Sequence, residues 1–307
     1  MKILIIGSNG FIGGSFARAA LEAGHEILGA GRPRADGVVS AKAYVETDLA
    51  AGKLAPIIAR VSPDVVLHAA GSASVEDSFA SPLQDLHNSV LTLANTLEGV
   101  RISKVRPLIV FPSSAAVYGT PDTLPINESA PVNPISPYGF HMFVRELIAR
   151  EYSECFGLHI VTARLFSVFG ARQRRLFIWE LYRQLMEEDS TVSLKGTGKE
   201  TRDYLHVDDV SSAFLELINV EAGLPSRSLV INVASGTEVS MLQVAQHLRE
   251  LIAPGKEIQC RGMSRPGNPL HWRADVSLLR SMAPGWRPAP FEKKLKKCID
   301  AWRRESE

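Results

Sequence analysis

Three evenly spaced glycines follow a short apolar run near the first residue of the sequence. The run Ile3–Ile6 leads directly into Gly7, Gly10 and Gly13, and a helical pattern begins as this turn ends. Because glycine has no side chain, backbone N–H groups in such a turn can come close to a bound pyrophosphate, and the N-terminus of the following helix adds a favourable dipole. The strand–turn–helix context therefore predicts a dinucleotide-binding site at this turn.

Short apolar runs alternate with helical patterns through the first half of the chain. The predicted strands are Ile3–Ile6, Glu26–Leu28, Val65–His68, Leu108–Phe111 and His159–Ala163, and the predicted helices are Ile12–Ala23, Leu54–Val61, Pro82–Leu97 and Ser136–Phe156. This alternation predicts an α/β fold with a doubly wound, Rossmann-type parallel sheet, which binds ligands at the carboxyl ends of its strands. The second half is richer in turn residues. We expect a dinucleotide-binding domain at 1–165 and a smaller, mainly substrate-binding lobe at 166–307, interleaved with the first across a soft boundary.

Composition and charge exclude several classes of protein. With 34 basic and 33 acidic residues the net charge is +1, so neither nucleic acid nor an anionic membrane is an expected partner. The 45% of apolar residues is typical of a soluble protein with a core, and no apolar run reaches membrane-spanning length. The three cysteines have no metal-site spacing, so we expect reduced thiols in a cytoplasmic protein without a metal site.

Further motifs follow the glycine turn in a characteristic order. They are Ser113–Gly119, Ser136–Gly139, Gly196–Gly198, Arg202–Tyr204, His206–Val210, Arg265–Asn268 and Ala274–Asp275. Together with the Gly-x-x-Gly-x-x-Gly spacing of the turn, they resemble the extended short-chain dehydrogenase/reductase family, in its NAD(P)-dependent nucleotide-sugar epimerase, dehydratase and reductase branch. The resemblance covers nearly the whole chain.

The resemblance implies which residues contact the dinucleotide. They lie in the glycine turn, after the following strands and in two later helices: Gly7, Asn9, Gly10, Phe11, Ile12, Gly13, Asp48, Leu49, His68, Ala69, Ala70, Gly71, Asn88 and Tyr138.

The end of the second strand bears on the choice of dinucleotide. By the family alignment an acidic residue that holds the adenosine ribose belongs near Gly31, where this chain has none, and Arg32 and Arg34 follow. A carboxylate would repel a 2′-phosphate, whereas arginines can pair with one. We therefore expect NADP to be favoured, with NAD possible.

The expected reaction centre departs from the family at one position. The resemblance makes Tyr138 the acid/base and Ser114 the residue that hydrogen-bonds the same sugar hydroxyl. The family has a lysine four residues after the tyrosine, which lowers the pKa of the phenol and holds the nicotinamide ribose. A tyrosine with a pKa near 10 needs that help at neutral pH.

Here the lysine position holds Met142, which keeps the shape but removes the charge. An engineered inactive form and a natural departure both explain it, and the intact remainder of the site favours the first. Either way we expect impaired catalysis, and Met142→Lys is expected to raise activity.

The residues beside Ser114 help to choose the reaction. Sugar 4,6-dehydratases carry an Asp-Glu pair directly after the active-site hydroxyl residue, whereas this chain has Ala115 and Ala116. The motif instead favours 4-epimerisation or 4-ketosugar reduction of a nucleotide sugar. The alternative is a catalytically inactive dinucleotide-sensing or scaffold protein on the same fold, which Met142 supports.

The resemblance also implies substrate contacts and an assembly. The expected substrate-binding residues are Ser72, Ser114, Ser167, Arg202 and Arg265, because arginine suits the phosphate oxygens of a nucleoside diphosphate. His206 and Asp209 are interpreted as structural. The helices Pro82–Leu97 and Ser136–Phe156 resemble the pair that forms a four-helix bundle in the family, so we expect a homodimer.

Overall fold

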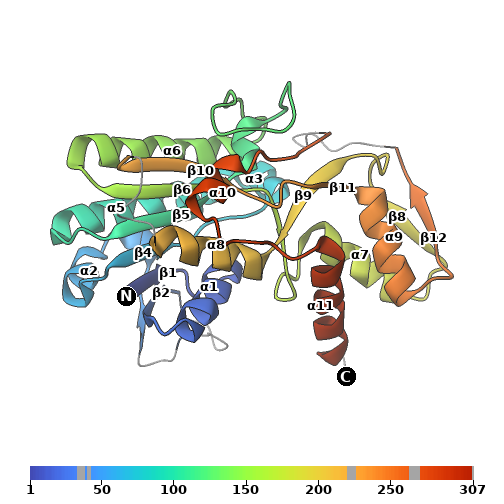
Figure 1. Cartoon of the computed structure of the whole chain (residues 1–307), viewed down its shortest axis with the longest axis horizontal. Helices are drawn as coiled ribbons and strands as arrows, with labels where there is room; N and C mark the ends of the chain where they lie inside the picture. The colour runs from blue at the N-terminus through green and yellow to red at the C-terminus, as the bar shows by residue number, and fades with distance from the viewer. Residues whose placement is uncertain (33–38, 40–42, 220–225, 263–269, 306–307) are drawn as a thin grey trace.

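A seven-stranded parallel sheet forms the centre of the molecule (Figure 1). The structure is a computed structural model that describes residues 1–32, 39, 43–219, 226–262 and 270–305. The strands follow the order β10-β6-β5-β4-β1-β2-β3. Their bounds are β1 Lys2–Ile6, β2 Glu26–Gly31, β3 Tyr44–Glu46, β4 Val65–His68, β5 Leu108–Ser114, β6 His159–Leu165 and β10 Ser228–Val233.

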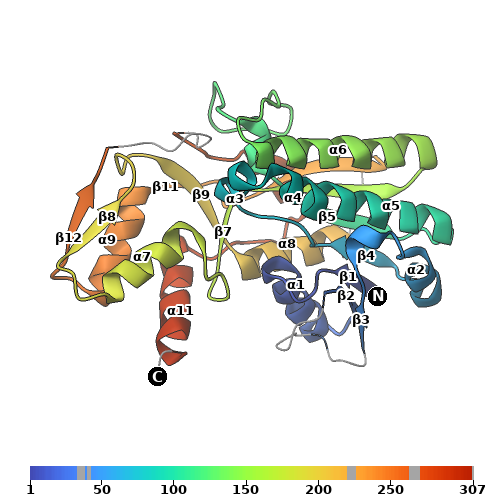
Figure 2. The same ribbon diagram turned by 180° about the vertical axis from the view of Figure 1, so that it is seen from behind.

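Helices cover both faces of this sheet. Residues Ile3 and Ile5 of β1 pack in one core cluster with α1 (Phe11–Glu22), α8 (Val207–Asn219) and α10 (Ser277–Met282). Residues Leu4 and Ile6 point the other way, into a second cluster with α2 (Ala55–Val61), α5 (Thr92–Ser103) and α6 (Pro137–Phe156), which Figure 2 shows in front of the sheet. Because consecutive side chains of a strand point to opposite faces, a fully apolar strand has both faces covered. The predicted doubly wound fold is confirmed.

The predicted helix Pro82–Leu97 is more complex than its sequence pattern. The chain forms α4 (Pro82–Leu86), then a π-helical turn at His87–Leu91, and then α5, which continues to Ser103. The Thr92 hydroxyl donates to the carbonyl of Asn88 at 2.7 Å, within this wider turn. A short helix, α3 (Val75–Ala80), precedes it. Single π-helical turns are frequent at functional sites, and this one carries Asn88.

A smaller lobe lies at one end of the sheet, on the right in Figure 1. It contains a three-stranded sheet in the order β11-β9-β7 and a two-stranded sheet of β12 and β8. The helices α7, α9 and α11 surround a third apolar cluster that includes the buried Trp302. The bounds are β7 Ser167–Phe169, α7 Leu176–Met186, β8 Thr191–Leu194, β9 Thr201–His206, β11 Glu238–Ser240, α9 Met241–Ile252, β12 Glu257–Cys260 and α11 Phe291–Arg304.

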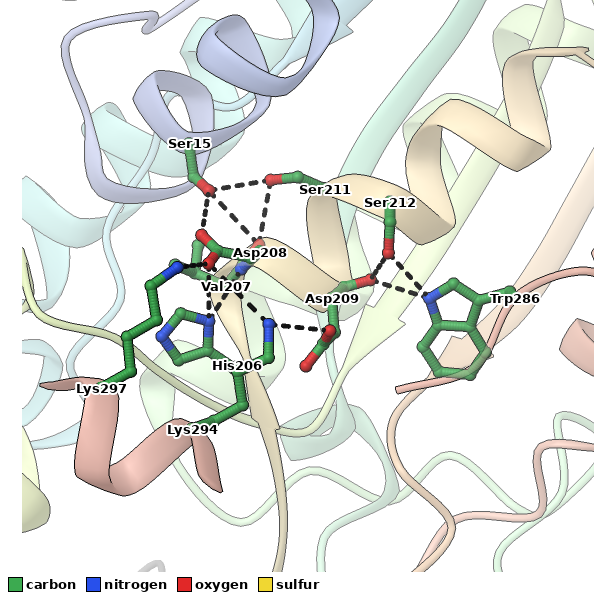
Figure 3. Close-up of polar contacts among 10 residues, drawn as sticks. All are labelled: Ser15, His206, Val207, Asp208, Asp209, Ser211, Ser212, Trp286, Lys294 and Lys297. Carbon is green, nitrogen blue, oxygen red and sulfur yellow. Dashed lines mark hydrogen bonds and ion pairs between the residues drawn. The ribbon is translucent and has the colours of Figure 1, made fainter. Parts of the chain in front are cut away.

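The two parts of the chain interleave. After entering the smaller lobe through β7, the chain returns to the main sheet through α8 and β10. Figure 3 shows the polar cluster that holds α1, α8 and α11 together at this junction. Asp208 accepts from Lys297 at 2.7 Å, Asp209 lies 3.1 Å from Lys294, and the Ser211 hydroxyl donates to Ser15 at 3.0 Å. No helix among the described residues is long and apolar enough to cross a membrane.

His206, in the same cluster, makes the stability of the fold sensitive to pH. Its ring is 4% exposed and its Nδ1 accepts from the Asp208 N–H at 3.2 Å. Burial lowers the pKa of His206 from 6.5 to about 4, against the opposing effect of the Asp208 carboxylate. The neutral ring is therefore favoured by folding, so its contribution to stability is complete above pH 6.5 and is lost as the pH falls toward 4.

We expect the free energy of unfolding to fall by roughly 2 kcal/mol between pH 6.5 and about pH 5 because of His206, at about 1.4 kcal/mol per pH unit. Urea denaturation at the two pH values measures this loss. His206→Gln, which cannot take up the proton, should show a smaller loss over the same interval. Equal losses in the two proteins would contradict the assignment.

Candidate active site

The glycine turn lies against the end of β4. Gly7 has a φ of +86°, and its N–H donates to the carbonyl of Ala30 at 2.7 Å. A Cβ built on Gly7 would lie 2.8 Å from the Ala70 nitrogen, and one on Gly13 would lie 2.3 Å from the Gly7 oxygen. The helix α1 follows from Gly10, with no side-chain cap and no acidic residue in its first turn. This close-packed backbone at an uncapped helix N-terminus suits a pyrophosphate.

Alanine substitutions at glycines of the turn are expected to weaken cofactor binding to different degrees. Gly13→Ala is expected to weaken dinucleotide affinity roughly tenfold to a hundredfold, because overpacking at 2.3 Å costs about 1–3 kcal/mol and displaces the turn. Gly10→Ala should have a smaller effect, since its Cβ would lie 3.1 Å from the Gly7 oxygen, and Gly255→Ala, with open space around it, should have none. Calorimetric titration of the folded variants measures all three. Equal affinities across the series would contradict a dinucleotide site at this turn.

The adenosine end of the expected site contains a carboxylate that the sequence analysis missed. Strand β3 pairs the backbone of Glu46 with that of Gly31 at the end of β2, and the Glu46 side chain is exposed. After burial, the charge of Glu46 is the second cause that raises the pKa of Tyr44. The side chain of Arg32 is exposed, and its carbonyl accepts from the Tyr44 hydroxyl at 2.7 Å. Arg34 lies outside the described residues.

The Asp48–Leu49 pair occupies a fixed turn. The Asp48 carboxylate caps a 3-10 turn at Leu49–Ala51 and accepts from the Ala50 N–H at 2.9 Å. Leu49 is buried in the core, and its carbonyl accepts from the Asn95 side chain at 3.0 Å. The exposed Asp48 therefore has a defined position, which is held from α5.

The segment after β4 places its backbone, rather than its histidine, toward the expected cofactor. The His68 ring is fully buried, with Nδ1 2.9 Å from the Thr96 hydroxyl. Burial, reinforced by the nearby Arg145, holds the pKa of His68 well below 6.5, so the ring is neutral. Ala69, Ala70 and Gly71 follow at the carboxyl edge of the sheet, where Gly71 has a φ of +149°.

Two neighbouring side chains lie above this edge. The Ser89 hydroxyl accepts from the Ser72 N–H at 3.1 Å, and Asn88 accepts from the Gln84 side chain at 3.1 Å. The first contact fixes the π-helical turn against the loop after β4, and the second is a local contact between α4 and that turn. Ser72 is thus held against the π-helical turn that carries Asn88.

The structure brings Ser114 and Tyr138 together. Ser114 ends β5, and its hydroxyl accepts from the Ala116 N–H at 3.2 Å. The helix α6 begins after Ser136, whose hydroxyl accepts from the Gly139 N–H at 3.1 Å, so Tyr138 lies in the first helical turn. Burial raises the pKa of Tyr138, while a side-chain hydrogen bond with Ser114 and the charge of Arg145 lower it. A phenol held by a hydroxyl at the sheet edge can exchange a proton with a bound alcohol.

A glycine explains why these two elements approach so closely. A Cβ built on Gly139 would lie 2.7 Å from the Ala116 oxygen, so any side chain there would push α6 away from the turn after Ser114. That turn is the 3-10 segment Ala115–Tyr118.

The comparisons with known proteins agree with this geometry. The profile of the NAD dependent epimerase/dehydratase family matches residues 3–234. The chain belongs to this family. A UDP-glucose 4-epimerase from Azospirillum brasilense is 31% identical, with 94% of this chain and 87% of that protein covered.

Two solved structures are similar over nearly their whole length. The structure of MoeE5 in complex with UDP-glucuronic acid and NAD has a TM-score of 0.88 at 26% identity, and covers 99% of this chain and 100% of its own. The complex of the Thermus thermophilus UDP-glucose 4-epimerase with NAD has a TM-score of 0.84 at 27% identity, and covers 99% of each chain. The expected membership of the nucleotide-sugar epimerase branch is thereby confirmed.

One helical turn after the tyrosine, this epimerase/dehydratase family member has a buried thioether. Met142 is 1% exposed, and its Sδ accepts from Nη1 of Arg145 at 3.2 Å. Arg145 was not among the site residues expected from the sequence. Its signal was present, because residues 138, 142 and 145 share one face of a helix.

The expected substrate residues Arg202 and Ser167 lie on strands of the smaller lobe. Arg202 lies on β9, where Nη1 donates to the Thr201 carbonyl at 2.7 Å and the guanidinium lies 5.4 Å from the centre of the Trp272 ring. Ser167 lies on the adjacent strand β7, in register with Tyr204. Arg265 lies outside the described residues. Within the described ranges, no group of three or more His, Cys, Asp or Glu side chains could hold a metal ion.

Proposed function

We propose that this protein is an NAD(P)-dependent nucleotide-sugar 4-epimerase. The observation that carries the proposal is the hydrogen-bonded pair of Ser114 and Tyr138 at the carboxyl edge of the sheet, beside the glycine turn. Ala115 and Ala116 fill the positions where dehydratases of the family carry acidic residues. The relatives named UDP-glucose 4-epimerase, and the solved structures with UDP-sugars, support a uridine diphosphate sugar as the substrate class.

Each residue has a defined role in this reaction. A dinucleotide held at the glycine turn would supply the hydride acceptor and donor that inversion at the sugar carbon requires. Tyr138 takes the proton of the sugar hydroxyl and returns it, and Ser114 hydrogen-bonds the same oxygen. Arg202 holds the diphosphate, because its half-buried guanidinium is a fixed, charged donor on the smaller lobe.

The test is turnover on a panel of UDP-, dTDP-, GDP- and CDP-sugars, with product stereochemistry and dinucleotide consumption both followed. An epimerase converts the sugar without net consumption of dinucleotide, whereas a 4-ketosugar reductase consumes it. Binding of the dinucleotide without turnover of any sugar on the panel would favour the second candidate, an inactive dinucleotide-sensing or scaffold protein, which Met142 supports.

The choice between the dinucleotides is a separate proposal. The NADP preference that Arg32 and Arg34 predict stays a prediction, and two observations oppose it. Glu46 brings a carboxylate to the end of β2, and the similar structures of MoeE5 and of the Thermus enzyme contain NAD. A carboxylate repels a 2′-phosphate, so we propose NAD as the cofactor.

We expect NAD to bind at least about tenfold more tightly than NADP, and Glu46→Gln to reduce this ratio. Calorimetric titration with both dinucleotides measures the ratio. Glu26→Gln, at the opposite end of β2, is the matched control and should leave it unchanged. Tighter binding of NADP by the unmodified protein would restore the prediction made from the arginines.

We also propose a homodimer that forms through α4, the π-helical turn and α6. Apolar side chains on these elements are exposed, among them Leu83, Leu91, Phe140, Val144 and Leu147. An apolar face of this kind on adjacent helices is typical of a helix–helix interface. Analytical ultracentrifugation of the protein and of Leu83→Glu/Val144→Glu tests it, and a monomer in the unmodified protein would contradict the assembly.

A further inference from the structure

A buried arginine lies beside Met142, the position where the family has a lysine. Arg145 is on α6, seven residues after Tyr138, and is 3% exposed. Its Nη1 donates to the Met142 sulfur at 3.2 Å and lies 3.6 Å from the point where a Cβ on Gly71 would be. The guanidinium carbon is 5.3 Å from the centre of the Phe111 ring. Arg145 therefore lies under the loop after β4, on the same helix face as the tyrosine.

The guanidinium forms no ion pair with the residues that the structure describes. Among the described residues, Nε and Nη2 of Arg145 are buried without a hydrogen-bond partner. Glu146 points elsewhere, because its carboxylate binds Arg164 at 2.7 Å and accepts from the Ser113 hydroxyl at 2.5 Å.

The other nearby carboxylate, Asp85, is engaged through one oxygen, which lies 2.5 Å from Nδ1 of His141. Its other oxygen, Oδ1, is buried without a hydrogen-bond partner among the described residues. Burying a cation with unused donors is costly, so a sequence keeps one mainly where a ligand uses it.

We propose that Arg145 supplies the cation of this reaction centre in place of the family's lysine, stabilising the Tyr138 phenolate and donating Nε and Nη2 to the nicotinamide ribose hydroxyls. This inference rests on the proposed function. Arginine suits the role because its planar group offers several fixed donors and keeps its charge when buried. Burial lowers the pKa of Arg145 to about 10, so the group stays charged at neutral pH.

The surrounding charges act on the tyrosine in a defined way. Burial raises the pKa of Tyr138, Arg145 lowers it, and Asp85 raises it. The remaining titratable groups around Arg145 are His68, which is neutral, His141, which is bound to Asp85, and Glu146, which is bound to Arg164. Among the described residues, Arg145 is thus the cation whose charge lowers the pKa of the Tyr138 phenol.

The position of Arg145 also changes the result expected from restoring the lysine. In the single variant Met142→Lys, an ammonium group would replace a sulfur that now accepts from Arg145 at 3.2 Å. Two cations at that distance repel one another. The rise in activity that the sequence predicts for Met142→Lys therefore requires the removal of Arg145 as well.

The test compares Arg145→Met, Arg145→Gln and the double variant Arg145→Met/Met142→Lys with the unmodified protein. Arg150→Met is the matched control, because Arg150 lies on the same helix but is exposed and paired with Glu154 at 3.9 Å. Two readouts need no sugar substrate. They are the pKa of Tyr138, from NMR of ring-labelled tyrosine assigned with Tyr138→Phe, and the affinity for NAD, from calorimetry.

We expect the pKa of Tyr138 to rise by about one to three units in Arg145→Met and Arg145→Gln, with NAD affinity reduced roughly tenfold. The double variant should recover both, and Arg150→Met should change neither. A Tyr138 pKa that stays constant in both single variants, or losses that the double variant does not recover, overturns the inference. If the pKa of Tyr138 and the NAD affinity change as expected but the unmodified protein turns over no sugar, the proposed function is refuted and the inference about Arg145 stands. Arg145→Gln keeps the test valid if Arg145→Met fails to fold.

Discussion

Tyr138→Phe is expected to reduce turnover of the nucleotide sugar by about a hundredfold to ten-thousandfold, the range that general acid–base catalysis contributes. The substitution removes one oxygen and leaves the ring in the apolar cluster that includes Met142. Affinity for NAD and for the sugar nucleotide should change little, because the glycine turn and Arg202 are untouched. The loss should therefore appear in kcat rather than in KM.

Steady-state kinetics on the sugar that the panel identifies measures this effect. Tyr152→Phe is the matched control, because Tyr152 lies on the same helix and donates to Glu98 at 3.0 Å, away from Ser114. Ser114→Ala should reduce kcat as well, by a smaller factor, since it removes a hydrogen bond and not the proton acceptor. Full activity in Tyr138→Phe would show that another group moves the proton.

Arg164→Met is expected to lower the free energy of unfolding by about 3–5 kcal/mol, the cost of leaving one partner of a buried ion pair alone. Arg164 on β6 is 5% exposed and donates to Glu146 of α6 at 2.7 Å. It also donates to the Tyr118 hydroxyl at 3.0 Å and to the Glu128 carbonyl at 3.1 Å. Among the described residues, its removal leaves the Glu146 carboxylate with the Ser113 hydroxyl as its remaining partner.

Urea denaturation measures this loss, with the exposed Arg150→Met expected to cost less than about 1 kcal/mol. The double variant Arg164→Met/Glu146→Leu should recover part of the stability, because no buried charge then remains unpaired. A loss in Arg164→Met as small as that of Arg150→Met would contradict a structural role for this pair.

Some features of the molecule were accessible from the sequence because local rules determine them. The strand β1 and its turn follow from an apolar run and from glycines at Gly7 and Gly13, whose missing side chains the backbone contacts require. The start of α6 follows from Ser136, whose hydroxyl caps the helix, so the position of Tyr138 in the first turn was predictable. The predicted end of the helix Pro82–Leu97 was wrong, because α5 continues to Ser103. The π-helical turn at His87–Leu91 was also missed, because it leaves no trace in the apolar periodicity.

The position of the Glu46 carboxylate beside the end of β2 depends on strand pairing. Glu46 is fifteen residues along the chain from Gly31, and the parallel register of β2 and β3 brings their backbones together. Neither propensity nor periodicity specifies that register. The NADP preference was therefore predicted from Arg32 and Arg34 alone, without the carboxylate of Glu46.

By itself the sequence determined the doubly wound fold, the glycine turn after β1 and the start of α6 at Ser136, because each follows from local periodicity, backbone sterics or capping. The pairing of Tyr138 with Ser114 was expected from the family resemblance and not from local rules. Only the tertiary structure decided which charges meet at the reaction centre. Arg145 and Glu146 are neighbours on α6, yet Glu146 binds Arg164 of β6, whereas Arg145 donates to Met142. The reason is physical: adjacent residues on a helix point in directions about 100° apart, so their partners are set by the elements packed on each side.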